Sequence, residues 1–212
     1  MGYAMMTRSM SYGYYGKLPF AGDFLRRGLS ADFVAAWDSW LQRTMIAGRE
    51  ELGDEHWTMS YFSAPIWRFS IAPGLCGSRG MAGILMPSLD SVGRRFPFCI
   101  ATETDLPPVA ANLALQPVVE RLEAAALEMI EVGASQERLV TLLSALPPTA
   151  SVDPNIGSHN GSLWVAAGTD QPRVLNLPAM PTGPAEAAAL FDIEAPFWLT
   201  PNEPAFLPET FT

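Results

Sequence analysis

IWRFSIA, residues 66–72, is the first of three apolar stretches that follow one another closely; the other two are MAGILM (81–86) and FPFCIATET (96–104). Trp, Phe and Ile recur in these stretches, as is typical of β-strands, and a proline follows each stretch within three residues. The segments that connect them are short and contain glycine, which favours tight hairpins. The three stretches therefore predict an antiparallel meander.

Further strands and helices are expected on both sides of this meander. The strands are expected at 12–18, 163–167 and 174–177. One helix is capped by Ser30 and ends near Arg49, a second begins at Pro117 and ends at Gly133, a third is capped by Ser135 and ends before Pro147, and a fourth spans 185–191. This order predicts an α+β fold, with a central, mainly antiparallel sheet and helices packed on its faces, in one domain over residues 12–212. Residues 1–11 are expected to be a flexible extension.

The hydrophobic core is expected to join the first helix to the meander. Four residues of the helix recur at three- and four-residue spacing and form one apolar stripe: Phe33, Trp37, Trp40 and Leu41. The stripe should pack on the sheet, where six strand residues are expected to contribute to one core: Trp67, Phe69, Ile71, Ile84, Phe96 and Ile100.

The charge balance excludes two classes of partner. The 212 residues include 13 Lys and Arg against 22 Asp and Glu, which gives a formal net charge of −9. Nucleic acids and anionic lipid surfaces attract clustered positive charge, so neither is expected as a partner. No run of about 18 apolar residues is present, and the first ten residues lack the apolar segment of a signal peptide. We therefore expect a cytoplasmic protein that does not insert into a membrane.

The residues that most often carry catalysis or bind metals are few and scattered. His56 and His159 are the two histidines, and Cys76 and Cys99 are the two cysteines. Their spacing does not close a tetrahedral metal site, and no G-x-S-x-G nucleophile motif is present. We therefore expect no metal, no cofactor and no catalytic residue, and interpret the chain as a non-enzyme. A carboxylate site built from Asp23, Asp38, Asp90 and Glu103 is left open, although no motif specifies it.

Two loops contain more polar residues than a simple connection requires. We call GKLPFAGDF (16–24) the first polar loop and PSLDSVGRRFP (87–97) the second polar loop. In the structural interpretation, Asp90 accepts hydrogen bonds from nearby backbone N–H groups, and one arginine pairs with a carboxylate such as Asp23. In the functional interpretation, the second polar loop is a positively charged lip that recognises a carboxylate or phosphate on a partner. Both loops are expected to emerge at one end of the sheet.

The same residues carry a resemblance to a known family. GKLP (16–19) followed by GDF (22–24), WDSWL (37–41), SAPIWRF (63–69) and GILMPSLDSVGRRFP (83–97) occur in the order and spacing of the TagF/ImpM family of type VI secretion-associated proteins, and SLW (162–164) fits a later strand of that family. The resemblance implies a cytoplasmic accessory protein of Gram-negative bacteria that represses the secretion system post-translationally. It also implies a forkhead-associated scaffold protein of the apparatus as the partner, permits a longin- or profilin-like three-layer arrangement, and transfers no catalytic residue.

Eight polar residues are the candidates for shaping the contact region: Lys17, Asp23, Asp38, Arg68, Ser88, Asp90, Arg94 and Arg95. Of these, Lys17, Ser88 and one of the two adjacent arginines are expected to face the partner. Asp23 and Asp38, pairing with Arg68 or an arginine of the second polar loop, are expected to hold the loops together. Two alternatives stay open: a sensor that binds a small anionic ligand between the two polar loops, and a carboxylate-based hydrolase.

Overall fold

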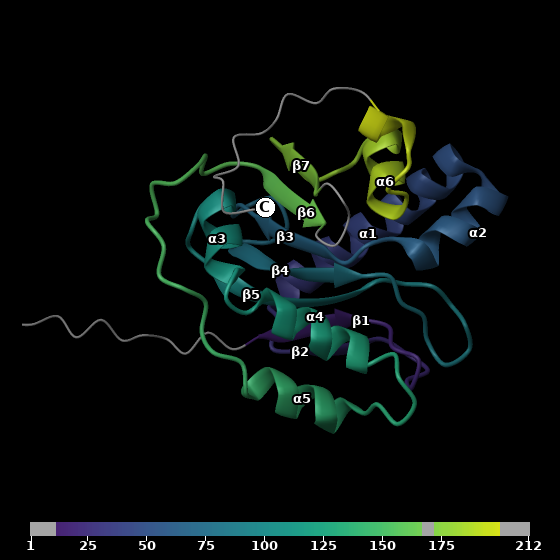
Figure 1. The fold of residues 1–212 in the computed structure, drawn as a ribbon, viewed down its shortest axis with the longest axis horizontal. Helices are drawn as coiled ribbons and strands as arrows, with labels where there is room; N and C mark the ends of the chain where they lie inside the picture. The colour runs from purple at the N-terminus through teal and green to yellow at the C-terminus, as the bar shows by residue number, and fades with distance from the viewer. Residues whose placement is uncertain (1–11, 167–171, 200–212) are drawn as a thin grey trace, which may run out of the picture.

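One antiparallel sheet organises the domain. The computed structural model describes residues 12–166 and 172–199, and the strand order within this part of the chain is β2-β1-β5-β4-β3-β6-β7 (Figure 1). The strands are β1 (Gly13–Gly16), β2 (Leu25–Arg27), β3 (Trp67–Ile71), β4 (Gly80–Met86), β5 (Phe98–Thr104), β6 (Ser162–Ala166) and β7 (Arg173–Leu177). The predicted extension, residues 1–11, lies outside the described residues. The α+β fold with an antiparallel sheet is confirmed.

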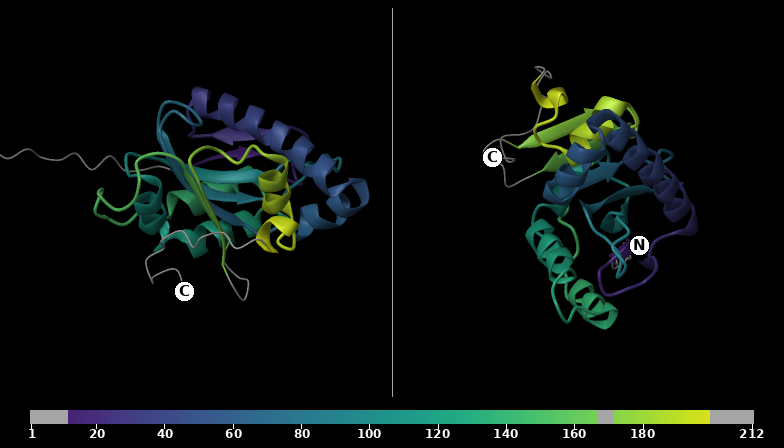
Figure 2. Two further views of the ribbon diagram at one scale, coloured as in Figure 1. Left: turned by 90° about the horizontal axis from the view of Figure 1, so that it is seen from above. Right: turned by 90° about the vertical axis from the view of Figure 1, so that its right-hand side faces the viewer.

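Helices cover both faces of the sheet and give the domain three layers (Figure 2). One face carries α1 (Ala31–Leu52), α2 (Asp54–Ser63) and α6 (Pro184–Phe191), and the other carries α3 (Pro108–Leu115), α4 (Val119–Glu128) and α5 (Gln136–Ser144). A short 3-10 helix, Pro196–Leu199, follows α6. None of the helices in the described part of the chain is long and apolar enough to cross a membrane.

The predicted meander forms the centre of the sheet. Phe69 pairs with Gly83, and Ile84 pairs with Ile100, so β3, β4 and β5 are consecutive antiparallel neighbours. Every residue of β3 and β4 is buried, because helices cover both faces of these strands. Gly83 has a steric role here: a Cβ atom at this position would lie 2.1 Å from the carbonyl oxygen of Ile100.

The core is divided in two by the sheet, whereas the sequence analysis expected a single core. The stripe of α1 packs as predicted on the face that carries Trp67, Phe69, Ile71 and Phe96. Ile84 and Ile100 point to the opposite face, toward α3, α4 and α5. The expectation of one core was wrong because side chains alternate between the two faces of a strand, and both faces are covered.

The first helical region is longer than expected and contains two helices. Helix α1 continues to Leu52, and Gly48 is buried within it against Trp57 of α2. Gly53, with φ at 77°, ends α1 and directly precedes α2, which the sequence analysis did not predict. The turn between two consecutive helices needs a positive φ, which glycine adopts without steric cost.

Two further elements were not predicted, and one boundary differs. The short strand β2 pairs with β1, and α3 begins at Pro108, soon after the end of β5 at Thr104. Helix α4 begins at Val119, after Pro117, and ends at Glu128, before Gly133. Ser135 caps α5 as predicted, since its Oγ accepts a hydrogen bond from the backbone N–H of Arg138 at 3.2 Å.

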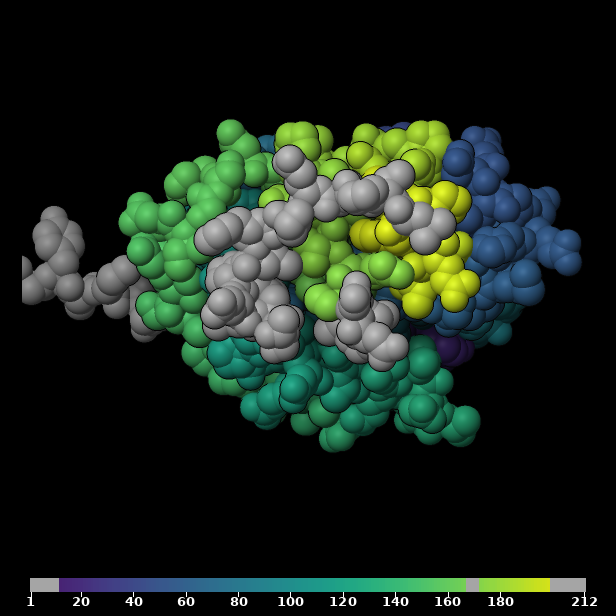
Figure 3. Space-filling view, turned by 45° about the horizontal axis from the view of Figure 1, so that its top comes forward, coloured from purple at the N-terminus to yellow at the C-terminus, as the bar shows by residue number. Residues whose placement is uncertain are grey.

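The C-terminal elements belong to the same sheet and layers as the rest. Strand β6 pairs with β3, and β7 pairs with β6, which extends the sheet beyond the meander. Helix α6 packs against α1 and α2, and Figure 3 shows α6 (yellow) at the surface beside these helices (blue). The C-terminal third therefore completes the sheet.

Candidate functional site

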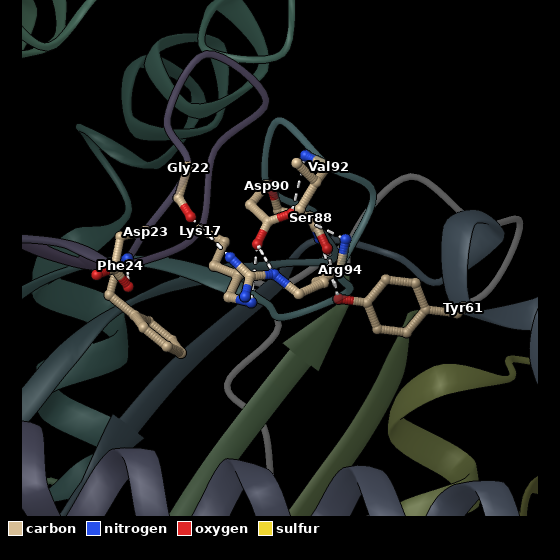
Figure 4. Close-up of polar contacts among 9 residues, drawn as sticks. All are labelled: Lys17, Gly22, Asp23, Phe24, Tyr61, Ser88, Asp90, Val92 and Arg94. Atoms are coloured by element: carbon tan, nitrogen blue, oxygen red, sulfur yellow. Dashed lines mark hydrogen bonds and ion pairs between the residues drawn. The ribbon is translucent and has the colours of Figure 1, made fainter.

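The two polar loops meet at one end of the sheet, as the sequence analysis expected. The backbone N–H of Ser91 donates to the carbonyl oxygen of Ala21 at 2.9 Å, and Nη2 of Arg94 donates to the carbonyl oxygen of Gly22 at 2.7 Å. These bonds join a loop that follows β1 to a loop that connects β4 and β5 (Figure 4). The two loops thus form one polar unit.

Asp90 is the centre of this unit. One carboxylate oxygen accepts the backbone N–H groups of Val92 at 3.1 Å and Arg94 at 2.9 Å, and the other accepts Lys17 Nζ at 3.0 Å and Arg94 Nε at 2.7 Å (Figure 4). The side chain has no solvent exposure. Burial acts to raise the pKa of Asp90, but the backbone N–H of Arg94 and the Lys17 and Arg94 side chains outweigh burial, and the pKa lies well below its usual range.

Lys17 and Ser88 are buried, although both were expected to face a partner. The Lys17 ammonium group is turned inward by its ion pair with Asp90, so Lys17 holds the loops together. The backbone of Ser88 is fixed by Tyr61 of α2, whose hydroxyl donates to the Ser88 carbonyl at 2.8 Å and accepts from the Ser88 N–H at 3.2 Å. Burial raises the pKa of Tyr61 above its ordinary value, which keeps this hydroxyl protonated.

The two adjacent arginines differ in their surroundings. Arg94 is tied to Asp90 and Gly22. The Arg95 guanidinium lies 5.1 Å from the ring centre of Phe62 and 5.7 Å from that of Tyr61, a cation–π arrangement. Among the described residues no carboxylate lies within ion-pair distance of Arg95. Arg94 is therefore the structural arginine of the loop, and Arg95 is the one whose charge is not neutralised by an ion pair.

Asp38 and Arg68 lie away from the polar unit, contrary to expectation. Asp38 is on α1, where it accepts hydrogen bonds from Tyr15 and Gln42, both at 2.6 Å. Arg68 is on β3 and points to the opposite face of the sheet, where its guanidinium donates to Gln116. The two residues cannot pair with each other, because the sheet separates them. Arg68 lies on the face opposite α1 because side chains alternate along β3, where its neighbours Trp67 and Phe69 face α1.

Asp23 belongs to the first polar loop but does not pair with an arginine of the second. Its carboxylate is exposed and accepts the backbone N–H of Phe24 at 2.8 Å. Asp90 forms the ion pair with Arg94 that was expected of Asp23, since Asp90 lies in the same loop as Arg94 and faces it directly.

The remaining candidates for chemistry are dispersed. Glu103 lies on β5 beside Arg79, at 3.7 Å, outside the polar unit. His56 pairs with Asp192 at 2.8 Å, between α2 and the end of α6. Cys76 and Cys99 are buried free thiols, and burial raises the pKa of Cys76 to about 12. Within residues 12–166 and 172–199 no three His, Cys, Asp or Glu side chains are grouped as a metal site would require.

An apolar groove adjoins the polar unit and was not foreseen. It has a volume of about 350 Å³ and is lined by residues of α2, the end of β4, both polar loops and the end of α4: Pro19, Phe62, Ala64, Ile66, Met86, Pro87, Ser88, Leu89, Leu127 and Ile130. None of these lining residues is charged, so the inner surface of the groove is almost entirely apolar. The apolar residues Leu127 and Ile130, near the end of the second predicted helix, were the available sequence signal, and the structure shows both of them exposed.

Comparison with known proteins identifies the family. Residues 13–146 match the model of the TagF N-terminal domain, described as type VI secretion system-associated. The chain belongs to the TagF N-terminal domain family. This TagF domain also resembles a solved structure, the crystal structure of PA0076 from Pseudomonas aeruginosa PAO1, at 29% sequence identity and a TM-score of 0.73. The similarity covers 92% of this chain and 99% of PA0076. No curated protein matches the sequence.

The matched region contains the whole polar unit. Both polar loops, α2 and α4 lie within residues 13–146 of the TagF match. The comparisons therefore associate this part of the molecule with type VI secretion in an accessory role.

Proposed function

We propose that this TagF protein is a non-enzymatic, cytoplasmic regulator that represses type VI secretion post-translationally by binding a forkhead-associated scaffold protein of the apparatus. Family membership supports the link to the secretion system. The observation that carries the binding proposal is the contrast within the second polar loop. Asp90 fixes the loop from inside, while Arg95 retains a charge without a carboxylate partner among the described residues.

A rigid loop with one unneutralised arginine is suited to protein recognition. Because Lys17, Arg94 and two backbone N–H groups already converge on Asp90, little loop entropy remains to be lost on binding. Arg95 lies over aromatic rings, which orient its guanidinium, and Nη1 donates to the Thr58 hydroxyl at 3.5 Å. Its other N–H groups can bind an acidic group. Recognition of a protein by such a loop needs no catalytic step.

The first prediction separates the two arginines. Arg94→Ala should lower the melting temperature, because it removes a cation from Asp90 and a donor from Gly22. Arg95→Ala should melt close to wild type but bind the purified scaffold protein more weakly. Thermal melts and biolayer interferometry measure the two effects, and binding should weaken as salt rises. If both variants melt and bind like wild type, the second polar loop is not the contact site.

The regulatory role is tested in cells. Deleting the gene should raise type VI secretion without changing the amount of scaffold protein. Wild-type protein should restore repression, and the Arg95→Ala variant, at equal abundance, should restore less. Unchanged secretion after deletion would contradict the repressor role.

A further inference from the structure

The apolar groove lies at the end of the molecule that carries the polar unit. Phe62 of α2 forms one wall, and Leu127 and Ile130 form the other. The right-hand panel of Figure 2 looks onto this end, with α2 (blue) on one side and α4 and α5 (teal and green) on the other. Phe62, Leu127 and Ile130 are 51%, 46% and 44% exposed, although each is a large apolar residue. Apolar walls of this kind gain free energy when another apolar group covers them.

Ser88 provides a polar feature inside the groove. Ser88 is one of the lining residues and is 3% exposed, and its buried Oγ has no hydrogen-bond partner among the described residues. A buried hydroxyl without a partner costs free energy, which an incoming acceptor would recover. The groove therefore combines apolar walls with one hydrogen-bond donor.

The charges at the rim differ from one wall to the other. Arg95 lies over Phe62 and has no carboxylate partner among the described residues, whereas the opposite wall ends near Glu128 and Glu131. Glu128 is already paired with Arg138 at 2.5 Å. An acidic group on a partner is therefore attracted to the α2 wall, where Arg95 lies. Arg95 therefore places one positive charge at the α2 wall of a chain whose net charge is −9, and this charge favours an acidic group at that wall.

We infer that the groove is a docking site for an acidic amphipathic segment of a protein partner. One large apolar side chain of the segment lies between Phe62 on one wall and Leu127 and Ile130 on the other. A main-chain carbonyl accepts from Ser88 Oγ, and an Asp or Glu of the segment pairs with Arg95. The volume of about 350 Å³ suits one such anchor and its neighbours. This inference rests on the proposed protein-binding function and adds to it the chemistry of the segment that is bound.

The test uses random peptides displayed on phage and the full-length chain. Peptides are selected on wild-type protein and depleted on the Ile130→Gln variant. The matched control is Ile46→Gln, since Ile46 is 59% exposed on α1 and does not line the groove. Surviving peptides should share a large apolar residue with Asp or Glu within one helical turn. They should lose about tenfold or more in affinity for Ile130→Gln and keep their affinity for Ile46→Gln.

A second pair of variants tests the charge. Arg95→Gln should weaken the selected peptides, whereas Arg43→Gln should not, because Arg43 is exposed on α1 and away from the groove. Ser88→Ala should weaken them while leaving the melting temperature close to wild type, since Ser88 Oγ has no hydrogen bond to another described residue. Equal binding of the peptides to Arg95→Gln and Arg43→Gln would overturn the acidic half of the inference.

Other occupants give distinct results. A self-association of wild-type protein that Ile130→Gln abolishes in analytical ultracentrifugation would show a second copy in the groove and overturn the inference. Failure to enrich any peptide that distinguishes Ile130→Gln from Ile46→Gln would also overturn it. If the scaffold protein binds both variants equally, the regulatory proposal stands and the groove inference fails. If the scaffold does not bind wild type but groove-dependent peptides are found, the choice of partner fails and the groove inference stands.

Discussion

Asp90 shows how one buried residue determines the shape of a loop. It accepts four hydrogen bonds, two from the backbone of its own loop and two from Lys17 and Arg94. Removing such a carboxylate leaves the Lys17 ammonium group buried beside an uncharged residue. This costs more free energy of folding than replacing both partners with apolar residues. The polar unit therefore stabilises the fold as well as shaping a surface.

We expect Asp90→Asn to lower the melting temperature by several degrees. The double variant Asp90→Asn/Lys17→Met should recover part of the loss, because methionine needs no counter-charge in a buried position. Differential scanning calorimetry of both variants checks this. If the single variant Lys17→Met melts far above wild type, the ion pair between Lys17 and Asp90 opposes folding.

The pH dependence of stability follows from the pKa of Asp90. That pKa is lower in the folded state than the ordinary value of about 3.9, so the ionised carboxylate favours folding. The stabilisation is complete above the ordinary value and is lost as the pH falls toward the folded-state value. The difference in unfolding free energy between wild type and Asp90→Asn should stay constant from neutral pH down to about pH 5 and shrink below about pH 4. Urea titrations across this range measure it.

At the scale of elements, the long helix α1 connects several elements on one face of the sheet. Trp40 of this helix is 3% exposed, donates from Nε1 to the carbonyl oxygen of Pro181 at 2.7 Å, and has its ring centre 5.2 Å from that of Trp164. It therefore connects α1 to the segment before α6 and to β6.

Trp40→Ala should destabilise the protein by about 3–5 kcal/mol, the range for deleting a buried large side chain. Trp40→Phe should cost less, because it retains an aromatic ring and loses mainly the hydrogen bond to Pro181. Chemical denaturation gives both values. Equal losses for the two variants would mean that packing of the Trp40 ring contributes little.

The elements that sequence reasoning identified are those with a strong apolar pattern. The meander and the α1 stripe have one, whereas α2 does not: Trp57 and Tyr61 point inward, but Met59 and Phe62 of the same helix are exposed. Helix α3 was missed because Pro108, its first residue, looks in sequence like the end of the preceding strand.

The site was predictable to the same extent. The two polar loops meet because β1 pairs with β5 in an antiparallel arrangement, which places the loop after β1 beside the loop before β5. The sequence analysis could expect this from the positions of the two loops relative to the predicted strands. The pairing of side chains within the site could not be predicted in the same way. The sequence offers several carboxylates as partners for Arg94, and the fold shows that Asp90 forms the ion pair. The groove depends on Phe62 of α2 and on Ile130, just after α4, which lie far apart in the chain. No local pattern relates them.

For the whole molecule, the family match ends at residue 146, but the sheet does not. Strand β6 pairs with β3 along its full length, and Trp164 of β6 lies against Trp37 and Phe69. The residues after 146 therefore cover part of the core.

A fragment containing residues 12–146 should fail to fold cooperatively. It lacks β6, β7 and α6, so it would expose the aromatic residues that these elements cover. Increased binding of a hydrophobic dye and a broad thermal transition, compared with residues 12–199, are the expected results. A sharp transition in the shorter fragment would show that residues 12–146 are independently stable.

The order of strands also determines when the protein can fold during its synthesis. The meander forms between neighbours in sequence, but Tyr14 pairs with Ile100, and Phe69 pairs with Trp164. At a translation rate of roughly 5–20 residues per second, the first strand waits several seconds for β5 to leave the ribosome. The edge of β3 that pairs with β6 then stays without a partner strand until β6 has been synthesised. The nascent chain thus exposes a pairing edge for seconds, and this interval is when ribosome-associated chaperones have most to protect.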